Sequence, residues 1–311
     1  MYDVIIIGGG PGGIAAGVYA ARKKMKVALI TDTLSGQSVA SVEIQNWIGT
    51  VSVSGLELAE MLEKHLRAQT DIDIVEGERA ASVTKRADGT YLVTTKSGKT
   101  FETKTLLLTI GSRHKRLEVP GEKEGEGHGV VYCAICDAPL FKDRDVVVVG
   151  GGNSGLEAVV DLLKYAKKIY LLHRGDALKG DASTQEKIAK EKNVEIILNA
   201  DTKEIVVDEK KMVHGLVYED KKSGAKRTLE VQGVFVEVGV QPNSELVKDL
   251  VKLTPQGSII VDPRTQRSSD GGIWAAGDVT DAPYRQNNIS AGDAIKAVLN
   301  IYDELHVKGR K

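Results

Sequence analysis

Short apolar runs separated by a glycine-rich turn shape the first part of the chain. Residues 3–8 form a β-rich apolar run that stops at the glycine-rich segment 8–13. An alanine-rich stretch with helical spacing follows over about 14–24, and a second apolar run covers 26–31. A strand, a helix and a second strand in this order predict a βαβ unit.

The same pattern recurs near the middle of the chain. An apolar run at 145–149 leads into a glycine turn, a helical stretch over about 154–165 and another apolar run at 168–172. The two copies align at a constant spacing without a gap, so that Arg174 in the second copy falls on Asp32 in the first. Two copies of one supersecondary unit predict two similar domains.

An amphipathic helix is predicted after the first unit. Ser54 and Glu57 have the spacing of a capping box, which marks the start of a helix. The apolar residues that follow are expected on one helical face: Leu58, Met61, Leu62 and Leu66. We therefore predict a helix that begins at Ser54 and packs against the first domain.

Strand-rich stretches follow both copies of the repeat. Residues 72–110 read as short strands with turns at Asp88-Gly89 and Ser97-Gly98. Residues 194–238 are similar and carry a turn at Ser223-Gly224. We therefore expect each domain to carry an added β-meander.

The last part of the chain, 246–311, has no counterpart after the first copy. It contains its own glycine turn at 275–278 and an amphipathic helix marked by Ala294, Ile295, Val298 and Ile301. We infer that this segment returns to complete the first domain. Ser112–His114 and Val240–Asn243 would then be the two linkers that cross between the domains.

The predicted fold is α/β, with two Rossmann-like three-layer nucleotide-binding domains, each with an added β-meander, and with the second inserted in the first. The first domain is expected to comprise residues 1–112 plus 243–311, and the inserted domain residues 113–242.

Composition and charge exclude several classes of function. The 311 residues are 41% hydrophobic and 27% charged, and the formal net charge is -1. Without a basic excess, no nucleic-acid partner is expected. No apolar run reaches the roughly 20 residues that span a bilayer, and the first strand begins too early to leave room for a signal peptide. We predict a cytoplasmic protein without a membrane partner.

Each copy of the repeat contains the pattern G-x-G-x-x-G. The glycines are Gly8, Gly10 and Gly13 in the first copy, and Gly150, Gly152 and Gly155 in the second. In a dinucleotide-binding turn, the first glycine allows the tight turn, the second lets the pyrophosphate approach, and the third lets helix and strand pack closely. An ordinary βα turn is the alternative, but the position between strand and helix favours nucleotide binding.

The residue after the second strand distinguishes the two copies. Asp32 can accept hydrogen bonds from ribose hydroxyls and would repel a 2'-phosphate. Arg174, preceded by His173 and followed by Lys179, would instead favour a 2'-phosphate. We therefore predict a FAD-like adenosine at the first site and NADPH at the second. The alternative is that Arg174 is a solvated surface residue.

The only two cysteines form a Cys133-x-x-Cys136 pair, followed at once by Asp137. Such a pair can close a small disulfide, and a lowered thiolate pKa makes one sulfur a nucleophile. Asp137 could donate or accept the proton. A zinc site needs further ligands that the sequence does not offer at suitable spacing, so no metal is predicted. Inert core cysteines are the other alternative.

With these motifs in order, the chain resembles the low-molecular-weight thioredoxin reductases and the related flavoprotein subunit of alkyl hydroperoxide reductase. The resemblance covers essentially the whole chain. The matching stretches are 8–13, Ser35-Gly36-Gln37, Glu43-Ile44-Gln45-Asn46-Trp47, Thr109-Ile110-Gly111, Cys133-Ala134-Ile135-Cys136-Asp137, 150–155, Gly277-Asp278-Val279 and Arg285-Gln286. Glutathione-reductase-type enzymes are less similar, since their CxxxxC dithiol lies in the FAD domain.

The motifs and the resemblance together assign residues to each cofactor. For FAD they are Gly8, Gly10, Gly13, Asp32, Gln37, Asn46, Gly111, Gly277, Asp278, Arg285 and Gln286. For NAD(P)H they are Gly150, Gly152, Asn153, Ser154, Gly155, His173, Arg174 and Lys179. The resemblance implies that NADPH reduces the flavin, and that the reduced flavin opens the disulfide at Cys136. Cys133 would then attack the substrate disulfide while Asp137 handles protons, and the inserted domain would rotate about the two linkers.

Three departures from the family pattern affect these expectations. NADPH-specific members usually read His-Arg-Arg-x-x-x-Arg, whereas residues 173–179 here are His-Arg-Gly-Asp-Ala-Leu-Lys, so NADH use stays open. Pro139-Leu140-Phe141 and the 150–155 turn look more like the hydroperoxide-reductase flavoprotein. The extra N-terminal redox module of that flavoprotein is not seen, so a separate carrier would have to serve any peroxiredoxin.

The predicted function is a thioredoxin-disulfide reductase. It would be a homodimeric flavoprotein that passes electrons from NAD(P)H through FAD and the Cys133–Cys136 dithiol to a small redox protein, with thioredoxin as the first candidate. One alternative is a reductase of a glutaredoxin-like carrier that serves a peroxiredoxin. Others are a hydrogen-peroxide-forming NAD(P)H oxidase and a ferredoxin–NADP reductase-like flavoprotein, neither of which needs the cysteines.

Overall fold

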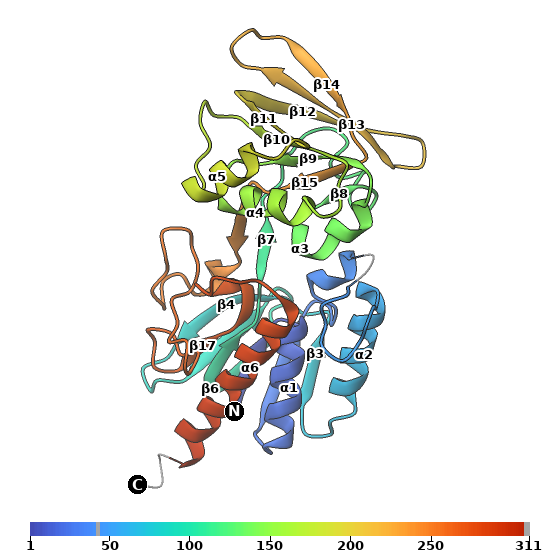
Figure 1. Ribbon diagram of the computed structural model, residues 1–311. Helices are drawn as coiled ribbons and strands as arrows, with labels where there is room; N and C mark the ends of the chain where they lie inside the picture. The colour runs from blue at the N-terminus through green and yellow to red at the C-terminus, as the bar shows by residue number, and fades with distance from the viewer. Residues whose placement is uncertain (42–43, 308–311) are drawn as a thin grey trace. The chain divides into compact units, whose positions relative to one another are not determined.

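The computed structural model describes residues 1–41 and 44–307. The chain divides into two compact units, the first made of Met1–Arg113 with Gln241–Lys311 and the second of His114–Val240. Figure 1 colours the chain from its N-terminus to its C-terminus, and the first unit contains both ends of the colour range. The second unit is therefore inserted in the first, as the sequence predicts.

The first unit is built on a seven-stranded sheet. Its order is β3-β2-β1-β6-β5-β4, with β17 also paired to β6. The strands are β1 (Tyr2–Ile7), β2 (Val27–Thr31), β3 (Asp73–Glu76), β4 (Ala80–Lys85), β5 (Tyr91–Thr95), β6 (Thr100–Leu108) and β17 (Ile273–Ala275). The strand β6 is parallel to β1 and β17 but antiparallel to β5. This one long strand therefore joins the parallel sheet to the β-meander β4-β5-β6.

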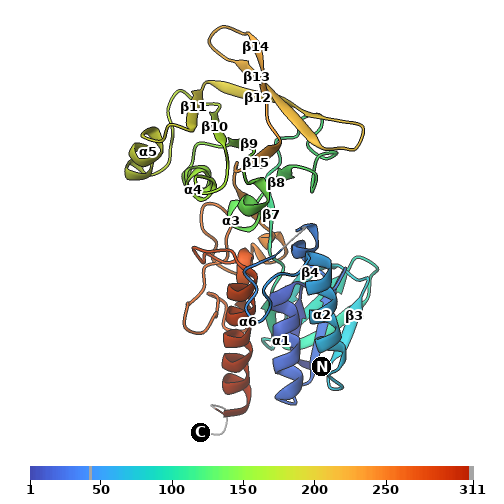
Figure 2. The ribbon, with the colours of Figure 1, turned by 45° about the vertical axis from the view of Figure 1, so that its right-hand side comes forward.

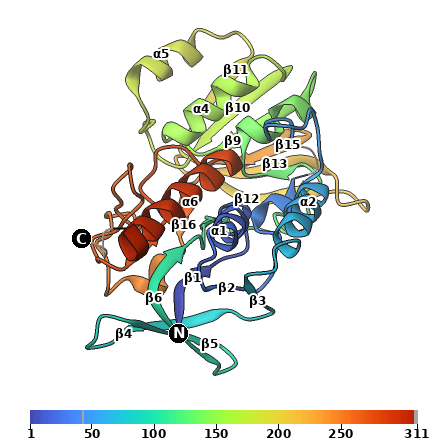
Figure 3. The same ribbon diagram turned by 90° about the horizontal axis from the view of Figure 1, so that it is seen from below.

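Three helices cover one face of this sheet. They are α1 (Pro11–Arg22), α2 (Gly55–Arg67) and α6 (Asn287–Tyr302). Figure 3 shows α1 between α6 and α2. Alternate residues of β1 point to opposite faces, so that Ile6 packs in the cluster under the helices while Ile5 packs in the cluster on the other side. Burial on both faces explains the uninterrupted apolar run of β1.

The helix α2 begins as the sequence predicts. The Ser54 hydroxyl accepts the Glu57 N–H at 3.2 Å, and the Glu57 carboxylate accepts the Ser54 N–H at 3.0 Å, which completes the capping box. Leu58 and Leu66 are fully buried, but Met61 is 49% exposed, so its assignment to the buried face is wrong. Leu58, Leu62 and Leu66 recur every four residues, and Met61 is turned about 100° from Leu62 around the helix axis.

The second unit contains a five-stranded parallel sheet and a separate antiparallel meander. The sheet order is β11-β10-β9-β15-β8, and the meander order is β12-β13-β14. The strands are β8 (Val130–Val131), β9 (Asp145–Val149), β10 (Lys168–His173), β11 (Val194–Leu198), β12 (Ala200–Val207), β13 (Val213–Asp220), β14 (Lys226–Glu230) and β15 (Gly233–Val236). Each unit thus has the predicted combination of a nucleotide-binding-type sheet and a meander.

The layers of the second unit lie on opposite faces of its parallel sheet. The helices are α3 (Ala134–Asp137), α4 (Asn153–Leu162) and α5 (Ala182–Ala189). One apolar cluster joins α4 to residues such as Val146 and Val148 of β9, while the other joins Val147 and Val149 to the meander. Figure 2 shows the meander on the side of the sheet away from α4. The result is the predicted three-layer arrangement.

Short elements complete the chain. The two segments that cross between the units, β7 (Ser112–His114) and β16 (Val240–Pro242), pair in a two-stranded sheet. The remaining turns of helix are η1 (Gln37–Ala40), η2 (Ala138–Phe141), η3 (Ser244–Val247), η4 (Gly277–Val279) and η5 (Asp303–Val307). Within the described residues, no helix is both long enough and apolar enough to cross a membrane.

Candidate functional site

The first glycine turn joins β1 to α1 in a conformation that needs glycine. Gly8 has φ +114°, and a Cβ on it would lie 2.4 Å from the Thr109 carbonyl oxygen. A Cβ on Gly13 would lie 1.8 Å from the Gly8 carbonyl oxygen, so a side chain there would push the helix off the strand. The helix α1 has Gly10 as its N-cap and no side-chain cap. An uncapped helix N-terminus suits a bound phosphate.

The second glycine turn has the same geometry. Gly150 has φ +137°, and a Cβ on Gly155 would lie 1.9 Å from the Gly150 carbonyl oxygen. The N-cap of α4 is Gly152, again without a side-chain cap, and a Cβ on Gly152 would meet no atom of the described residues within 4 Å. The first turn of α4 starts with Asn153 and Ser154, both exposed. The structure therefore offers a second open helix N-terminus that fits a dinucleotide pyrophosphate.

The residues after β2 and β10 differ in charge. Asp32 is exposed directly after β2, and its carbonyl oxygen accepts the Gly77 N–H at 3.2 Å. Arg174 and Lys179 are exposed after β10. The Lys179 N–H donates to the Gly151 carbonyl oxygen at 2.7 Å, which returns this loop to the glycine turn. Asp32 and Arg174 thus directly follow the ends of β2 and β10, and Lys179 lies farther along the loop after β10.

His173 lies beneath the second glycine turn. It is 9% exposed, and a Cβ on Gly151 would lie 2.6 Å from its Cγ. Burial, reinforced by the charges of Lys179 and Arg174, lowers the pKa of His173, so the ring is neutral at neutral pH. Its buried Nε2 has no hydrogen-bond partner among the described residues. An orphaned polar atom beside the turn is consistent with a ligand-binding edge.

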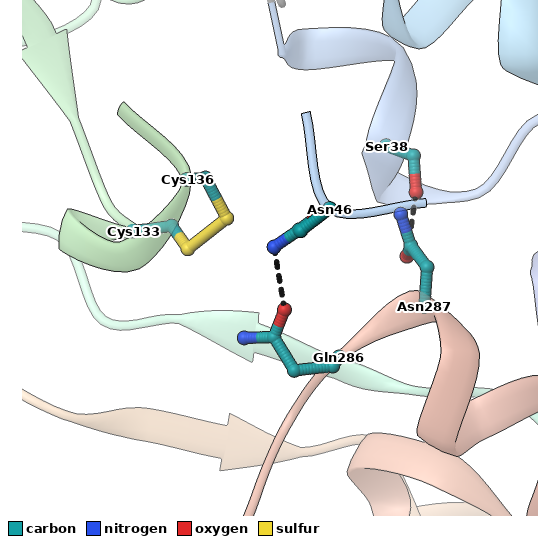
Figure 4. The surroundings of a disulfide bond; sticks show 6 residues. All are labelled: Ser38, Asn46, Cys133, Cys136, Gln286 and Asn287. Atoms are coloured by element: carbon teal, nitrogen blue, oxygen red, sulfur yellow. Dashed lines mark hydrogen bonds between the residues drawn. A yellow bond between two sulfur atoms is a disulfide. The ribbon is translucent and has the colours of Figure 1, made fainter. Parts of the chain in front are cut away.

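Several residues assigned to FAD gather around the start of α6. Asn46 Nδ2 donates to Gln286 Oε1 at 3.0 Å, and Ser38 Oγ donates to Asn287 Oδ1 at 2.9 Å (Figure 4). Asn288 Nδ2 also donates to the Asn46 carbonyl oxygen at 2.7 Å. These bonds tie η1 and the segment after it to the N-terminal end of α6. Glu43, which belongs to the same sequence motif, lies outside the described residues.

Two further loops of the first unit carry the remaining assigned residues. Gln37 Nε2 donates to the Ser112 carbonyl oxygen beside Gly111, which has φ +62°. Gly277, with φ +76°, directly precedes Asp278. Burial raises the pKa of Asp278, and the exposed Arg285 opposes that rise.

The two cysteines form a disulfide in the second unit. Cys133 and Cys136 are bonded through their sulfurs, with Cα atoms 5.3 Å apart (Figure 4). Cys133 is the N-cap of α3, and its carbonyl oxygen accepts the N–H groups of Cys136 at 3.2 Å and Asp137 at 3.0 Å. Asp137 is buried, and burial raises its pKa to about 6. The segment therefore combines a reducible bond with a carboxyl that exchanges protons near neutral pH.

Sequence reasoning missed one acidic residue in this region, Glu237. Its carbonyl oxygen faces Gly150 just as that of Thr109 faces Gly8. Burial raises the pKa of its carboxyl to about 8, and the Ala134 N–H opposes this rise. The available signal was an acid at the end of the apolar run 234–239, at the position where the matching run in the first unit has Thr109.

Comparisons with known proteins agree with this architecture. A family model described as pyridine nucleotide-disulphide oxidoreductase matches residues 2–297. The F subunit of alkyl hydroperoxide reductase in Xanthomonas campestris pv. phaseoli is 41% identical over 98% of this chain and 57% of its own length. NADH dehydrogenase from Bacillus subtilis (strain 168) is 38% identical over 98% of this chain and 58% of its own length. The chain thus spans less than two thirds of the length of these relatives.

Solved structures give the same result over nearly all of their length. The crystal structure of thioredoxin reductase from Streptococcus pyogenes MGAS5005 has a TM-score of 0.89 and 34% identity, with 98% of each chain covered. Thioredoxin reductase from Giardia duodenalis has a TM-score of 0.89 and 30% identity, again with 98% of each chain covered. The resemblance drawn from the motifs is confirmed: this chain belongs to the pyridine nucleotide-disulphide oxidoreductase family, whose members use FAD and NAD(P)H.

Proposed function

We propose that this protein is a FAD-dependent disulfide reductase that uses NAD(P)H to reduce a small redox protein, with a thioredoxin-like protein as the first candidate. The observation that carries the proposal is the Cys133–Cys136 disulfide at the start of α3, with Asp137 as the next residue. A C-x-x-C disulfide backed by a proton-exchanging carboxyl is suited to reversible thiol–disulfide exchange.

The two glycine turns support the cofactor assignments. The first unit presents an uncapped α1 N-terminus and Asp32, which fit the pyrophosphate and ribose of FAD. The second presents an uncapped α4 N-terminus with Arg174 and Lys179 nearby, which fit NADPH. When bound, FAD supplies two-electron transfer between a nicotinamide and a disulfide.

The chain's own residues would then manage the sulfur chemistry. Opening the Cys133–Cys136 bond takes two electrons and requires at least one proton for the sulfur that becomes a thiol. Asp137, whose pKa of about 6 is set by burial, can take up and release that proton near neutral pH. As the family resemblance implies, Cys133 would attack the acceptor disulfide, while Cys136 would be the sulfur nearer the flavin.

The choice of nicotinamide rests on the loop after β10. Arg174 and Lys179 favour the 2'-phosphate of NADPH, whereas the exposed Asp176 between them repels it. We therefore propose a preference for NADPH with measurable use of NADH. Anaerobic addition of each nucleotide should bleach the oxidised flavin band, more readily with NADPH. Equal or better bleaching by NADH would contradict the role given to Arg174.

A second candidate acceptor is a glutaredoxin-like carrier that serves a peroxiredoxin. The observation in its favour is the 41% identity to the F subunit of an alkyl hydroperoxide reductase. Reduced enzyme should be mixed anaerobically with each candidate carrier, and the carrier that restores the flavin colour at the lower concentration is the preferred acceptor.

We also propose that the protein is a cytoplasmic homodimer whose two crossing segments, β7 and β16, act as a hinge.

Replacing one cysteine tests the proposal against functions that do not need the dithiol. Cys136→Ser should still allow NADPH to bleach the flavin but should abolish reduction of the carrier. A hydrogen-peroxide-forming oxidase or a ferredoxin–NADP reductase-like enzyme would keep its turnover in this variant. If Cys136→Ser reduced a protein disulfide at the wild-type rate, the proposed function would be wrong.

A further inference from the structure

The turn between β13 and β14 lies against the loop that follows β10. The Lys221 N–H donates to the Asn199 carbonyl oxygen at 2.8 Å, and the Asn199 N–H donates to the Gly175 carbonyl oxygen at 2.8 Å. The Lys221 side chain reaches the same loop, with its Nζ 3.5 Å from the Arg174 carbonyl oxygen. Backbone and side chain therefore both place Lys221 beside the first two residues after β10.

The turn that carries Lys221 is closed by its own hydrogen bonds. The Gly224 N–H donates to the Asp220 carbonyl oxygen at 2.7 Å, and the Asp220 N–H donates to the Ala225 carbonyl oxygen at 2.9 Å. The Asp220 carboxylate also accepts the Lys222 N–H at 2.9 Å. The backbone of Lys221 is thus held on both sides, and only its side chain needs to move to meet a ligand.

The loop after β10 carries little positive charge of its own. Arg174 and Lys179 are cations, Asp176 is an anion, and all three side chains are exposed. Two cations and one anion leave a single net positive charge, whereas a phosphate monoester carries about −1.5 to −2 at neutral pH. Gly175 has no side chain and offers no cation. A 2'-phosphate at this loop therefore retains negative charge that a neighbouring cation can neutralise.

The C-terminal end of β10 is the place where a bound nucleotide would present its adenosine ribose. In a doubly wound sheet, the second strand of the βαβ unit ends at the ribose, while the pyrophosphate lies at the helix N-terminus. Here the second strand is β10, which runs parallel to β9, and the helix is α4. The Lys221 ammonium lies beside the backbone of Arg174 and therefore at the ribose end of the site.

We propose that Lys221 is a specificity-determining residue for the nicotinamide nucleotide, and that it pairs with the 2'-phosphate of NADPH together with Arg174. The inference rests on the proposed function, because it takes the second glycine turn as the NAD(P)H site. It adds to that site a cation from the β-meander, 47 positions along the chain from Arg174.

The chemistry of the ammonium group suits this role. It carries three N–H donors, so one long contact with a carbonyl oxygen leaves donors for phosphate oxygens. Lys221 is exposed, and turning its side chain toward a bound phosphate requires no rearrangement of the core. NADH presents only ribose hydroxyls at the same place, and these attract an ammonium less than a phosphate does. Lys221 should therefore distinguish the two nucleotides.

Binding of two adenosine nucleotides measures this effect without any electron transfer. Adenosine 2',5'-bisphosphate carries the distinguishing phosphate, and 5'-AMP differs from it only in lacking that group. Isothermal titration of the oxidised, FAD-loaded protein at about 0.1 M ionic strength, where the Debye length is about 10 Å, gives Kd for both. Lys221→Gln should raise Kd for the bisphosphate by about 3- to 5-fold and leave Kd for 5'-AMP unchanged. An equal change in both values, or no change in either, would overturn the proposal.

Two further variants serve as matched controls. Lys221→Arg keeps the positive charge and should keep the wild-type ratio of the two Kd values. Lys210→Gln removes one exposed charge from the turn between β12 and β13, at the opposite end of the eight-residue strand β13 and roughly 25 Å away, and should also keep that ratio. A change in Lys210→Gln as large as in Lys221→Gln would show an effect of overall charge and would contradict the proposal.

Arg174→Gln separates failure of this inference from failure of the nucleotide assignment. If Arg174→Gln weakens binding of the bisphosphate and Lys221→Gln does not, the site stands and the role given to Lys221 is wrong. If the wild type binds both nucleotides equally, neither cation binds a 2'-phosphate, and the inference fails together with the NADPH preference. None of these titrations uses the dithiol, so the disulfide reductase activity is judged separately through Cys136→Ser.

Discussion

The two glycine turns have the same backbone geometry, but the residues that they contact differ. A Cβ on Gly9 would lie 2.5 Å from the Thr31 hydroxyl oxygen, and a Cβ on the equivalent Gly151 would lie 2.6 Å from the His173 ring. Thr31 ends β2 and His173 ends β10, so the same contact is made by a small hydroxyl in one unit and by a neutral imidazole in the other. The shared turn fits a dinucleotide, while the strand end carries the difference between the two sites.

A second difference lies at the end of the next strand. Thr109 in the first unit donates its hydroxyl to the carbonyl oxygens of Ile7 and Gly8. The equivalent Glu237 instead carries a carboxyl whose pKa burial raises to about 8. The first unit therefore uses this position to close its own turn, whereas the second places a carboxyl of raised pKa there. The two units thus differ chemically through single residues at equivalent positions of the same backbone arrangement.

The largest effects are expected where the turns themselves are broken. Gly13→Ala should yield a protein without bound flavin, because its Cβ would clash with the Gly8 carbonyl oxygen. Gly155→Ala should keep the flavin yet weaken NADPH binding by about 100-fold or more, equivalent to about 2.8 kcal/mol. Flavin absorbance and NADPH titration measure the two outcomes.

Gly152→Ala separates steric damage from loss of ligand approach. A Cβ at this position meets no atom within 4 Å in the part of the chain that the structure describes, so the variant should unfold at the wild-type temperature while binding NADPH poorly. If Gly155→Ala left NADPH binding unchanged, the second turn would not be the nucleotide site.

Exchanging the strand-end charge should alter nucleotide preference without altering the fold. Arg174→Asp gives the second site the residue found at Asp32 in the first, and kcat/KM for NADPH should fall by about 10- to 100-fold. The value for NADH should hold or rise. The control Lys167→Asp, also exposed but before β10, should leave the ratio of the two values unchanged. If Arg174→Asp left the ratio of kcat/KM for NADPH to kcat/KM for NADH unchanged, Arg174 would be a solvated surface residue without a role in nucleotide preference.

Glu237→Thr, which gives the second unit the residue found at Thr109 in the first, should change the pH dependence of stability. A carboxyl whose pKa is raised in the folded state stabilises the fold at low pH, and this contribution is lost as pH rises through the folded pKa, here about 8. Between pH 7 and 9.5 the wild type should therefore lose about 1.4 kcal/mol more than Glu237→Thr. Thermal or urea unfolding at both pH values measures the difference; parallel losses would show that Glu237 does not titrate in this range.

The smallest effects are expected at the helix caps. Ser54→Ala removes the capping box of α2 and should cost about 1 kcal/mol. Asp181→Ala removes the cap of the shorter helix α5, where the carboxylate accepts the Thr184 N–H at 3.1 Å, and should cost about 0.5 kcal/mol. Urea unfolding of both variants would reveal the order, and a larger loss at Asp181 would contradict it.

Much of the fold is predictable because its signals are local. The local sequence alone predicts a strand at 3–8, a glycine turn after it and a helix after that turn. The copy at 145–165 repeats this pattern. The capping box at Ser54 is of the same kind. The insertion of the second unit also follows from the sequence, because the final segment has no counterpart after the first copy.

The rest depends on contacts between residues far apart in the chain. The bond from Asn46 to Gln286 spans 240 positions. The bond from the Glu237 N–H to the Val149 carbonyl oxygen requires β15 to lie beside β9 in the sheet. The helix α3 was not predicted because it is only four residues long and has no amphipathic period to detect. The helix α5 is eight residues long, with Ile188 as its only buried residue among those described. Short elements of this kind gain their stability from tertiary packing.

The central claim is that the Cys133–Cys136 disulfide is a second two-electron acceptor beside the flavin. An anaerobic reductive titration with dithionite measures this directly, because a flavin and a disulfide each accept two electrons. The wild-type holoenzyme should need two equivalents of this two-electron reductant to bleach the flavin fully, and Cys136→Ser should need one. If both proteins were fully reduced by a single equivalent, the disulfide would lie outside the electron path and the account would be wrong.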